Sequence, residues 1–430
     1  MTPRKEEALA SSCLGGEPKR PLPDGWRWVR LGEVIAEAQP GFACGARDPE
    51  GVIQLRMNNV DTRGNLIWDK FIRVPADEET VSRYRLVSGD VVFNNTNSTE
   101  LVGKSALFTG YVEPVVYSNH FTRLRVVSDS LFPEFLAYSL LLEWQARTFE
   151  NLCNRWIGQS AVKNDKLLAL EIPLPPLSEQ KRIAGVLREQ MGAVERARAA
   201  AEAQRTAAHA IPAAYLRAVF NTPEAQAWPR RRVAELCDRI NYGYTASADF
   251  TVAEPRLLRI TDIQEGRVAW QQVPGCRIDA EDEAAHALAD GDIVFARTGA
   301  TTGKSFLIRQ PPRAVFASYL IRLRLTGEML PDFVYAFFQS PDYWRQVREN
   351  VRGAGQPNLN ASLLGAMTVP VPPLADQQRI AARLAGQMAA AERLREGLEE
   401  QLEALAKLPA SLLRRAFSGE LRCDGDALRC

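Results

Sequence analysis

The chain has 430 residues, of which 46% are hydrophobic and 24% charged, and its formal net charge is +1. These proportions are ordinary for a globular protein with room for two or three domains, and no apolar run approaches the roughly 20 residues that span a bilayer. The near-neutral charge counts against a protein that binds DNA alone, which usually carries a basic surplus. It does not count against a subunit whose partner neutralises the phosphates.

The cysteines and histidines exclude several kinds of site. The seven cysteines are scattered and form no CxxC pair, which argues against a disulfide framework and a zinc site and fits the reducing cytosol of a prokaryote. They are Cys13, Cys44, Cys153, Cys237, Cys276, Cys423 and Cys430. The three histidines, His120, His209 and His286, are too few for a histidine-built metal or acid–base centre, and we interpret them as packing or surface residues.

Taken in chain order, the predicted elements occur twice. Residues 1–20 carry charges, glycine and proline without the apolar core of a signal peptide, so we interpret them as a disordered lead-in. Short β-like runs follow at 90–93, 105–108 and 121–127, a helix is predicted from Pro133, and a long helix over 178–220. The second half gives runs at 292–295, 305–308 and 320–325, a helix from Pro331, and a long helix over 375–417.

The two halves are copies of each other. The segment IPLPPLSEQKRIA at 172–184 returns as VPVPPLADQQRIA at 369–381, with eight identical positions and an offset of 197 residues. Gly89-Asp90 matches Gly291-Asp292, and Gly103-Lys104-Ser105 matches Gly303-Lys304-Ser305. This period is far longer than the 20 to 50 residues of a solenoid repeat and indicates a duplicated domain. A shared scaffold with divergent loops is what a pair of recognition modules would show, arranged with pseudo-two-fold symmetry.

The long helices carry a heptad pattern over about five heptads, which predicts that they pack on each other through an a/d seam. One column of the first helix holds Leu187, Val194, Ala201, Ala208 and Tyr215, and its other column Ile183, Gln190, Ala197, Gln204 and Ile211. The second helix has Leu384, Ala391, Leu398, Leu405 and Leu412, with Ile380, Gln387, Leu394, Gln401 and Leu408. Gln190 matches Gln387 and Gln204 matches Gln401, and such polar seam residues fix register. Pro212 and Pro409 are expected to kink the helices.

A helix of roughly 43 residues is about 64 Å long, nearly two turns of duplex DNA at about 34 Å each. The helices therefore fit a spacer that holds two globular halves a fixed distance apart. A dimerisation coiled coil is the alternative that composition leaves open.

These features together resemble the specificity subunit of type I restriction-modification systems (HsdS). The resemblance rests on the repeated Pro-rich hinge, IPLPPLSEQ at 172–180 and VPVPPLADQ at 369–377. It also rests on the helix endings YLRAVF at 215–220 and LLRRAFSGEL at 412–421, on RTGATTGK at 297–304, and on the Gly158-Gln159-Ser160 and Gly355-Gln356-Pro357-Asn358 loops. It covers the chain from about Leu22 to Leu421. Each motif alone is modest evidence, but all of them occur twice in the same order.

The resemblance implies an α/β (α+β) fold with two duplicated target recognition domains and two long helices packed as an antiparallel coiled coil. The implied domains are 21–176 and 222–373, with spacer helices at 177–221 and 374–421 and a tail at 422–430. Each recognition domain would read half of a split, asymmetric site in double-stranded DNA. The helices would dock two methyltransferase subunits, and motor-nuclease subunits would join for cleavage. S-adenosylmethionine and ATP are then expected on the partners alone, because this chain would determine which DNA sequence is bound and would perform no chemistry.

The candidate DNA contacts are polar side chains in matched loops, since amides, hydroxyls and cations read base edges or hold phosphates. They are Asn94, Asn95, Thr96, Asn97, Lys104, Gln159, Ser160 and Lys163, then Arg297, Thr298, Thr301, Thr302, Lys304, Gln356, Asn358 and Asn360. Ordinary turn chemistry is the alternative for these loops. Arg123 and Arg125 share one strand face, as do Arg322 and Arg324, so each pair could hold phosphate, although a solvated strand face is favoured.

Two rival functions come from other classes of protein. Gly299 to Ser305 looks like a phosphate-binding P-loop, but only three residues separate its glycines where four are needed. The second rival is a coiled-coil adaptor without DNA binding, which explains the helices but not the paired, loop-divergent halves. The sequence shows neither the Gly-rich cofactor loop nor the Asn/Asp-Pro-Pro-aromatic motif of an adenine methyltransferase.

Overall fold

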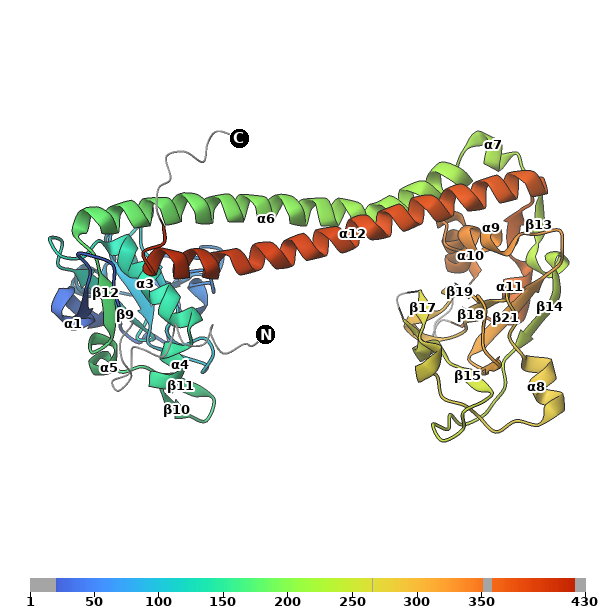
Figure 1. Cartoon of the computed structure of the whole chain (residues 1–430), viewed down its shortest axis with the longest axis horizontal. Helices are drawn as coiled ribbons and strands as arrows, with labels where there is room; N and C mark the ends of the chain where they lie inside the picture. The colour runs from blue at the N-terminus through green and yellow to red at the C-terminus, as the bar shows by residue number, and fades with distance from the viewer. Residues whose placement is uncertain (1–20, 265, 351–357, 422–430) are drawn as a thin grey trace. The chain divides into compact units, whose positions relative to one another are not determined.

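The computed structural model describes residues 21–264, 266–350 and 358–421 and divides the chain into two compact units. Unit 1 takes in Met1–Ala200 and Leu402–Cys430, and unit 2 takes in Ala201–Gln401. Each unit contains small sheets, short helices and parts of both long helices (Figure 1). The expected lead-in at 1–20, the tail at 422–430 and Gln356 lie outside the described residues.

Unit 1 is built from short strands with helices between them. Its strands are β1 (Arg27–Arg30), β2 (Ile35–Pro40), β3 (Val52–Leu55), β4 (Ile72–Val74), β5 (Val91–Asn94), β6 (Thr96–Asn97), β7 (Ser105–Leu107), β8 (Val115–Tyr117), β9 (Phe121–Val126), β10 (Asn154–Trp156), β11 (Gln159–Ala161) and β12 (Glu171–Leu174). Its helices are α1 (Leu31–Val34), η4 (Met57–Asn59), α2 (Glu78–Tyr84), α3 (Pro133–Gln145), α4 (Thr148–Leu152) and α5 (Asn164–Leu168), and the long α6 (Leu177–Phe220) begins here.

Unit 2 repeats this order. Its strands are β13 (Arg230–Arg232), β14 (Cys237–Tyr242), β15 (Arg256–Leu258), β16 (Ile263–Gln264), β17 (Arg267–Val268), β18 (Ile293–Ala296), β19 (Ser305–Leu307), β20 (Ala314–Phe316), β21 (Leu320–Leu325) and β22 (Thr368–Pro370). Its helices are α7 (Pro223–Gln226), η5 (Val233–Leu236), η6 (Ile260–Asp262), η7 (Trp270–Gln272), α8 (Ala280–His286), η8 (Gly299–Thr301), α9 (Pro331–Phe338), α10 (Pro341–Asn350) and α11 (Ala361–Ala366), and the long α12 (Leu374–Phe417) begins here.

The sheets confirm the duplication. The main sheet has the order β2-β9-β5-β7 in unit 1 and β14-β21-β18-β19 in unit 2, and its pairs are antiparallel in both. A parallel pair lies beside it in each unit, β3 with β8 and β15 with β20. The predicted strand runs and the helix starts at Pro133 and Pro331 agree with the structure to within one residue. The α/β prediction is confirmed.

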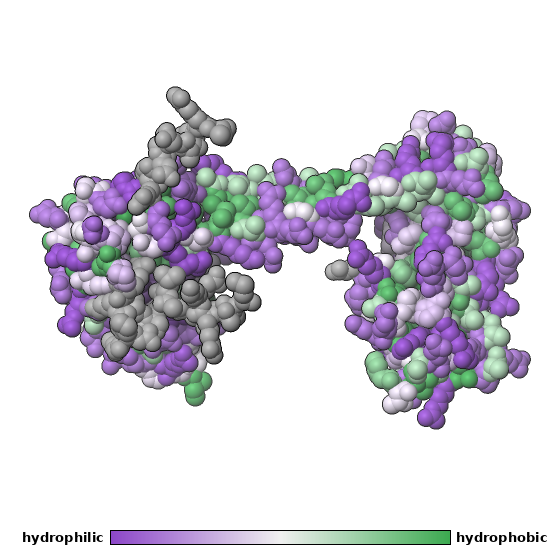
Figure 2. Space-filling view, in the orientation of Figure 1, coloured by the Kyte–Doolittle hydropathy of each residue, from purple (hydrophilic) through white to green (hydrophobic). Residues whose placement is uncertain are grey.

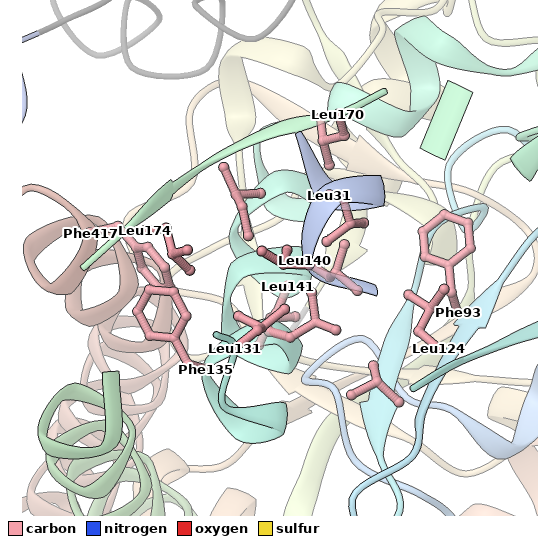
Figure 3. Packing of buried hydrophobic residues seen from close by; sticks show 14 of the residues in the cluster. Leu31, Phe93, Leu124, Leu131, Phe135, Leu140, Leu141, Leu170, Leu174 and Phe417 are labelled. Carbon is pink, nitrogen blue, oxygen red and sulfur yellow. The ribbon is translucent and has the colours of Figure 1, made fainter. Parts of the chain in front are cut away.

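Apolar residues from α3 and the main sheet form the core of unit 1 (Figure 3). Leu131, Phe135, Leu140 and Leu141 are buried there, and the ring of Phe135 lies 4.9 Å from that of Phe417, near the end of α12. Unit 2 has the equivalent arrangement at the end of α6. The ring of Phe220 lies 5.6 Å from that of Phe333 and 5.4 Å from that of Phe337 on α9. In each unit, therefore, the end of one long helix packs on the first helix after the main sheet.

Both long helices contain 44 residues and stay helical through Pro212 and Pro409. They begin at the starts implied by the resemblance, 177 and 374, which are one residue before the starts predicted from composition. No helix of the described residues is both long and apolar enough to cross a membrane.

The predicted two-column seam holds in one column only. Leu187, Val194, Ala201 and Ala208 are buried on α6, as are Leu384, Ala391 and Leu398 on α12. The second column starts buried at Ile183 and Ile380, but Leu394 and Leu408 are 47% and 42% exposed, and Gln204 and Gln401 are also exposed. A straight helix drifts by about 20° per heptad relative to a 3.5-residue repeat. Residues of the second column therefore rotate away from the partner helix after the first heptads and become exposed. The register role assigned to Gln204 and Gln401 is therefore wrong. Of the described residues, Gln190 keeps a buried Oε1 without a hydrogen bond, and Gln387 is half-buried.

A buried glutamine ties the start of each long helix to its unit. The Gln180 Oε1 accepts from the Phe132 N–H at 2.8 Å, and its Nε2 donates to the Ser130 and Pro175 carbonyls at 2.9 Å. The Gln377 Oε1 accepts from the Leu330 N–H at 2.8 Å, and its Nε2 donates to the carbonyls of Pro372 at 3.0 Å and Glu328 at 3.3 Å. One amide thus joins the hinge, the long helix and the beginning of α3 or α9.

Replacing Gln377 by alanine should lower the free energy of unfolding by about 2–4 kcal/mol, because a buried N–H and two carbonyls lose their partner. The neighbouring Gln378 is exposed, so Gln378→Ala is the matched control and should stay within about 0.5 kcal/mol of the parent chain. Urea unfolding of the full chain measures both. Equal stability of the two variants would contradict the role given to the buried amide.

Candidate nucleic-acid interface

The asparagines at the end of β5 and up to the end of β6 hold the backbone of their own segment. Asn94 Nδ2 donates to the carbonyls of His120 at 2.9 Å and Thr96 at 3.1 Å, and Asn97 Nδ2 donates to Asn94 Oδ1 at 2.6 Å. Asn95 Nδ2 donates to Thr122 Oγ1 at 3.1 Å, and Thr96 Oγ1 donates to Asn95 Oδ1 at 2.7 Å. Asn94, Asn95 and Asn97 are buried and Thr96 is half-buried. These residues match the turn-chemistry alternative, because their amides are used inside the loop.

Lys104 is also buried. Its ammonium group donates to the carbonyls of Met57 and Val60, and burial lowers the pKa of the lysine while Asp61 raises it. Lys104 is therefore not available as a DNA contact, and a structural role in its own unit, the alternative to DNA contact, holds at this position. The reason is that η4 brings two carbonyl oxygens to a side chain from a distant part of the sequence.

The matching Lys304 in unit 2 is exposed. Its Nζ makes no hydrogen bond or ion pair within the described part of the chain, and it borders a cavity of about 340 Å³ with Thr261, Gln264 and Thr301. Thr298, Thr301 and Thr302 are half-buried, and Thr302 Oγ1 donates to the Gly299 carbonyl at 2.7 Å. Lys304 is thus the one of the two matched lysines whose charge faces solvent.

The loop before Lys304 does not have the surroundings of a P-loop. A P-loop lysine and its following Ser or Thr open a helix, whereas Ser305 begins the strand β19. The Gly303 carbonyl accepts from the Tyr343 hydroxyl at 2.7 Å, and Gly303 has φ +84° with Val347 and Trp344 at 3.2–3.3 Å from an added Cβ. The repeated glycine is therefore explained by a tight turn packed on α10.

Arg297 lies in an aromatic environment. Its guanidinium lies 4.4 Å from the centre of the Tyr242 ring and donates to the Ser318 carbonyl at 3.1 Å. Its backbone N–H donates to the carbonyl of Tyr319, whose side chain is exposed. The positions of unit 1 that match Tyr242, Arg297 and Tyr319 in the sheet register are Pro40, Asn95 and His120. The same place in the two units therefore carries different side chains, with aromatic and cationic groups in unit 2.

The third pair of matched loops is only partly described. In unit 1, Gln159 and Lys163 are exposed, whereas Ser160 is buried with its Oγ 2.8 Å from Thr99 Oγ1. In unit 2, Asn358 is exposed and forms a bridge with Thr298, and the Asn360 side chain accepts from the Leu363 N–H as the cap of α11. Ser160 and Asn360 thus have structural partners, while Gln159, Lys163 and Asn358 face solvent.

The paired strand arginines belong to a buried ion network. Arg125 Nε donates to Asp90 Oδ1 at 2.8 Å, and Arg324 Nε donates to Asp292 Oδ1 at 2.8 Å, so both carboxylates raise the pKa of their arginine. Arg322 is fully buried; this lowers its pKa to about 10, although Asp292 acts in the opposite direction.

Arg123 is also buried and pairs with Glu37 at 2.9 Å. The expectation of a solvated strand face is wrong for Arg123 and Arg322, and their guanidinium groups are already engaged inside their unit. The phosphate-holding alternative requires an accessible guanidinium, which these two residues do not offer.

Sequence reasoning missed the tip of the β10–β11 hairpin. Trp156 is 60% exposed and Ile157 is fully exposed, and Arg155 beside them is exposed as well. The signal was present in the sequence: a tryptophan and an isoleucine directly before Gly158, in a polar loop, are unusual surface residues. The exposed members of the candidate interface of unit 1 are therefore Arg155, Trp156, Ile157, Gln159 and Lys163.

Replacing each of the two matched lysines should change a different property of the protein. Lys304→Ala should leave the free energy of unfolding within about 0.5 kcal/mol of the parent chain and reduce the salt slope of DNA binding by about one phosphate contact. Lys104→Ala should lower the free energy of unfolding by about 1–3 kcal/mol, because two buried carbonyls lose their donor.

Urea unfolding of the full chain measures the stability effects. Binding of the full chain, in complex with the methyltransferase subunit that the resemblance implies, to a duplex at several salt concentrations measures the salt slope. An unchanged salt slope for Lys304→Ala would remove this lysine from the DNA interface.

Comparison with known proteins gives a family. The model of the type I restriction modification DNA specificity domain matches residues 23–196 and 277–404, more than half of the chain. The type I restriction enzyme EcoKI specificity subunit of Escherichia coli is 25% identical over 397 residues, which cover 85% of this chain and 82% of that one. A putative MjaX specificity subunit of Methanocaldococcus jannaschii is 36% identical over 185 residues. That match covers 43% of this chain and spans less than half of the relative, 42% of its length.

Solved structures have the same fold. A chain from a type I R-M system, studied for its complex assembly and conformational transition, has a TM-score of 0.70 at 23% identity, with 94% of this chain and 100% of that chain covered. The HsdS subunit of Thermoanaerobacter tengcongensis has a TM-score of 0.64 at 23% identity and the same coverage. The chain belongs to the type I restriction modification DNA specificity domain family.

Proposed function

We propose that the chain is the DNA sequence-recognition subunit of a type I restriction-modification enzyme and reads a bipartite, asymmetric site in double-stranded DNA. Residues 21–176 and 222–373 would be the two recognition domains. The family match and the relatives named as specificity subunits support this role. So do two units with one sheet order and different exposed side chains at matching positions.

That difference between matching positions is the observation that carries the proposal. A duplicated scaffold with identical surfaces would read the same sequence twice. Here the exposed Pro40 of unit 1 corresponds to the exposed Tyr242 of unit 2, and the half-buried His120 corresponds to the exposed Tyr319. The two tyrosines offer rings and hydroxyl groups that proline and histidine do not, so the two units would contact base edges differently and prefer different base pairs. The expected site therefore has two unlike halves.

The chemistry of the enzyme would reside in partner subunits. Two methyltransferase subunits would dock on the long helices, and motor-nuclease subunits would join for cleavage, with S-adenosylmethionine and ATP bound by these partners. Two residues of α12 support docking, because Leu394 and Leu408 are large apolar side chains left in contact with water. The near-neutral charge of the chain also fits a complex in which partners neutralise part of the DNA charge.

The proposal is tested by a methylome. The chain is co-expressed with a methyltransferase subunit of its own system in a host that lacks such systems, and modified adenines are mapped by sequencing. We expect one two-part motif with a fixed unread gap. A purified complex that yields no motif would overturn the recognition role and favour a coiled-coil adaptor.

The length of the long helices should set the gap. Seven residues add about 10.5 Å to an α-helix, which corresponds to about three base pairs at 3.4 Å each. Adding a heptad to the middle of both α6 and α12 should therefore lengthen the gap by about three base pairs and leave both half-sites readable. A heptad of the same composition that replaces existing residues is the control. A lengthened variant that still recognises the original spacing would exclude the spacer role.

A further inference from the structure

The β10–β11 hairpin of unit 1 is a two-stranded ribbon with a tight turn. Trp156 pairs with Gln159 across the ribbon, and Ile157 and Gly158 form the turn between them. Gly158 has φ +78° with open space around an added Cβ, so the glycine is required by the backbone conformation and not by crowding. Directly opposed residues of an antiparallel pair project from the same face. Trp156 and Gln159 therefore present one apolar and one amide group side by side.

The base of the ribbon is held firmly. β11 pairs with β6 through Ser160 and Asn97, and Ser160 Oγ lies 2.8 Å from Thr99 Oγ1. Lys166 Nζ donates to the Leu152 carbonyl at 2.8 Å and to Asn154 Oδ1 at 3.3 Å. The ribbon thus joins the Asn-rich loop after β5, and its tip projects from an anchored base.

The tip is apolar and exposed, and two exposed cations lie close to it in the sequence. Ile157 is 107% exposed and Trp156 is 60% exposed. Figure 2 shows a hydrophobic protrusion on a mainly hydrophilic surface where Figure 1 places β10 and β11. Arg155 directly precedes Trp156, and Lys163 follows the end of β11 by two residues; both are exposed, as is Asp165. The exposed Arg147 is already paired with Glu150. An apolar tip with cations on its own segment of chain is poorly suited to water and suits a polyanion that also has apolar edges.

We propose that this ribbon enters the major groove of one half-site and reads an A·T pair there. The major groove admits a two-stranded β-ribbon, a glutamine amide can pair with N6 and N7 of adenine, and apolar side chains contact the thymine methyl group. Gln159 would take the adenine edge, and Ile157 with Trp156 would cover the thymine methyl. Arg155 and Lys163 would hold the flanking phosphates. This inference rests on the proposed function and adds the residues that determine one half of the specificity.

The test removes single atoms from the DNA and matched atoms from the ribbon. The duplexes carry the two-part motif identified by the methylome. In them thymine is replaced by uracil, which lacks only the methyl group, or adenine by 7-deazaadenine, which lacks the N7 acceptor. Each A·T pair of both half-sites is substituted in turn. Binding is measured for the complex of the full chain with its methyltransferase partner, using the parent chain, Ile157→Ser, Gln159→Ala and Val112→Ser. Val112 is 91% exposed and lies outside the ribbon, so its variant is the matched control.

We expect uracil at one position to weaken binding of the parent complex about fourfold, the effect of exposing one buried methyl group. 7-Deazaadenine in the same pair should weaken it about fivefold, the effect of one lost hydrogen bond. Ile157→Ser should lose the uracil effect and Gln159→Ala the deazaadenine effect, while Val112→Ser keeps both. A base substitution in the other half-site should change binding by the same factor in the parent complex and in every variant.

Two results would overturn the inference. One is a parent complex and ribbon variants that respond alike to every substituted base. The other is that the ribbon variants bind DNA normally but no longer retain the methyltransferase subunit, which would make the tip a protein contact. A parent complex that yields no two-part motif at all would instead contradict the proposed function, so the two failures are distinguishable.

Discussion

The buried glutamine at the start of each long helix is the constraint on which the rest of the structure depends. A 44-residue helix can act as a spacer only if its direction is fixed relative to the domain that it leaves. Gln180 and Gln377 provide this fixation, because one side-chain amide satisfies a helix N–H and two loop carbonyls at once. The aromatic contacts of Phe417 in unit 1 and Phe220 in unit 2 hold the other helix ends. Each long helix is therefore held by hydrogen bonds at its start and by aromatic packing at its end.

The buried ion pairs of Asp90 and Asp292 are a second constraint, because they fix the main sheet of each unit. Asp90 and Asp292 are nearly inaccessible, and each accepts hydrogen bonds from an arginine and from a backbone N–H three residues before it. A buried carboxylate without partners would be very costly, so the aspartate and the arginines must be kept together. This explains why the Gly-Asp and Arg-Leu-Arg motifs occur in both halves. The residues that the halves share mostly stabilise the scaffold.

The residues that differ between the halves are the better candidates for recognition. Lys104 and Asn94 lie in repeated or polar motifs and proved to be buried and internally bonded. Arg297, Trp156 and Ile157 are replaced by different residues at the matching positions of the other half of the sequence. They lie beside or within exposed surface. A protein that uses one scaffold to read two sequences needs this division. Stability fixes the shared positions and leaves the loop positions free to carry different chemistry.

The sequence by itself determined the duplication, three strands and one helix start in each half, and the extent of the long helices, because these depend on local periodicity, propensity and proline placement. It also indicated the family through motifs that recur in the same order. Only the tertiary structure decided which polar residues of those motifs are accessible. Lys104 is buried by carbonyls that lie 44 and 47 residues away in the sequence, and Arg123 is buried by an acidic partner 86 residues away.

The seam of the long helices shows the same division. The heptad pattern predicted two buried columns, yet Leu394 and Leu408 are exposed because a straight helix pair covers only one column over most of its length. Whether a side chain is buried depends on residues that are distant in the sequence and pack against it, so the local sequence pattern alone does not determine it.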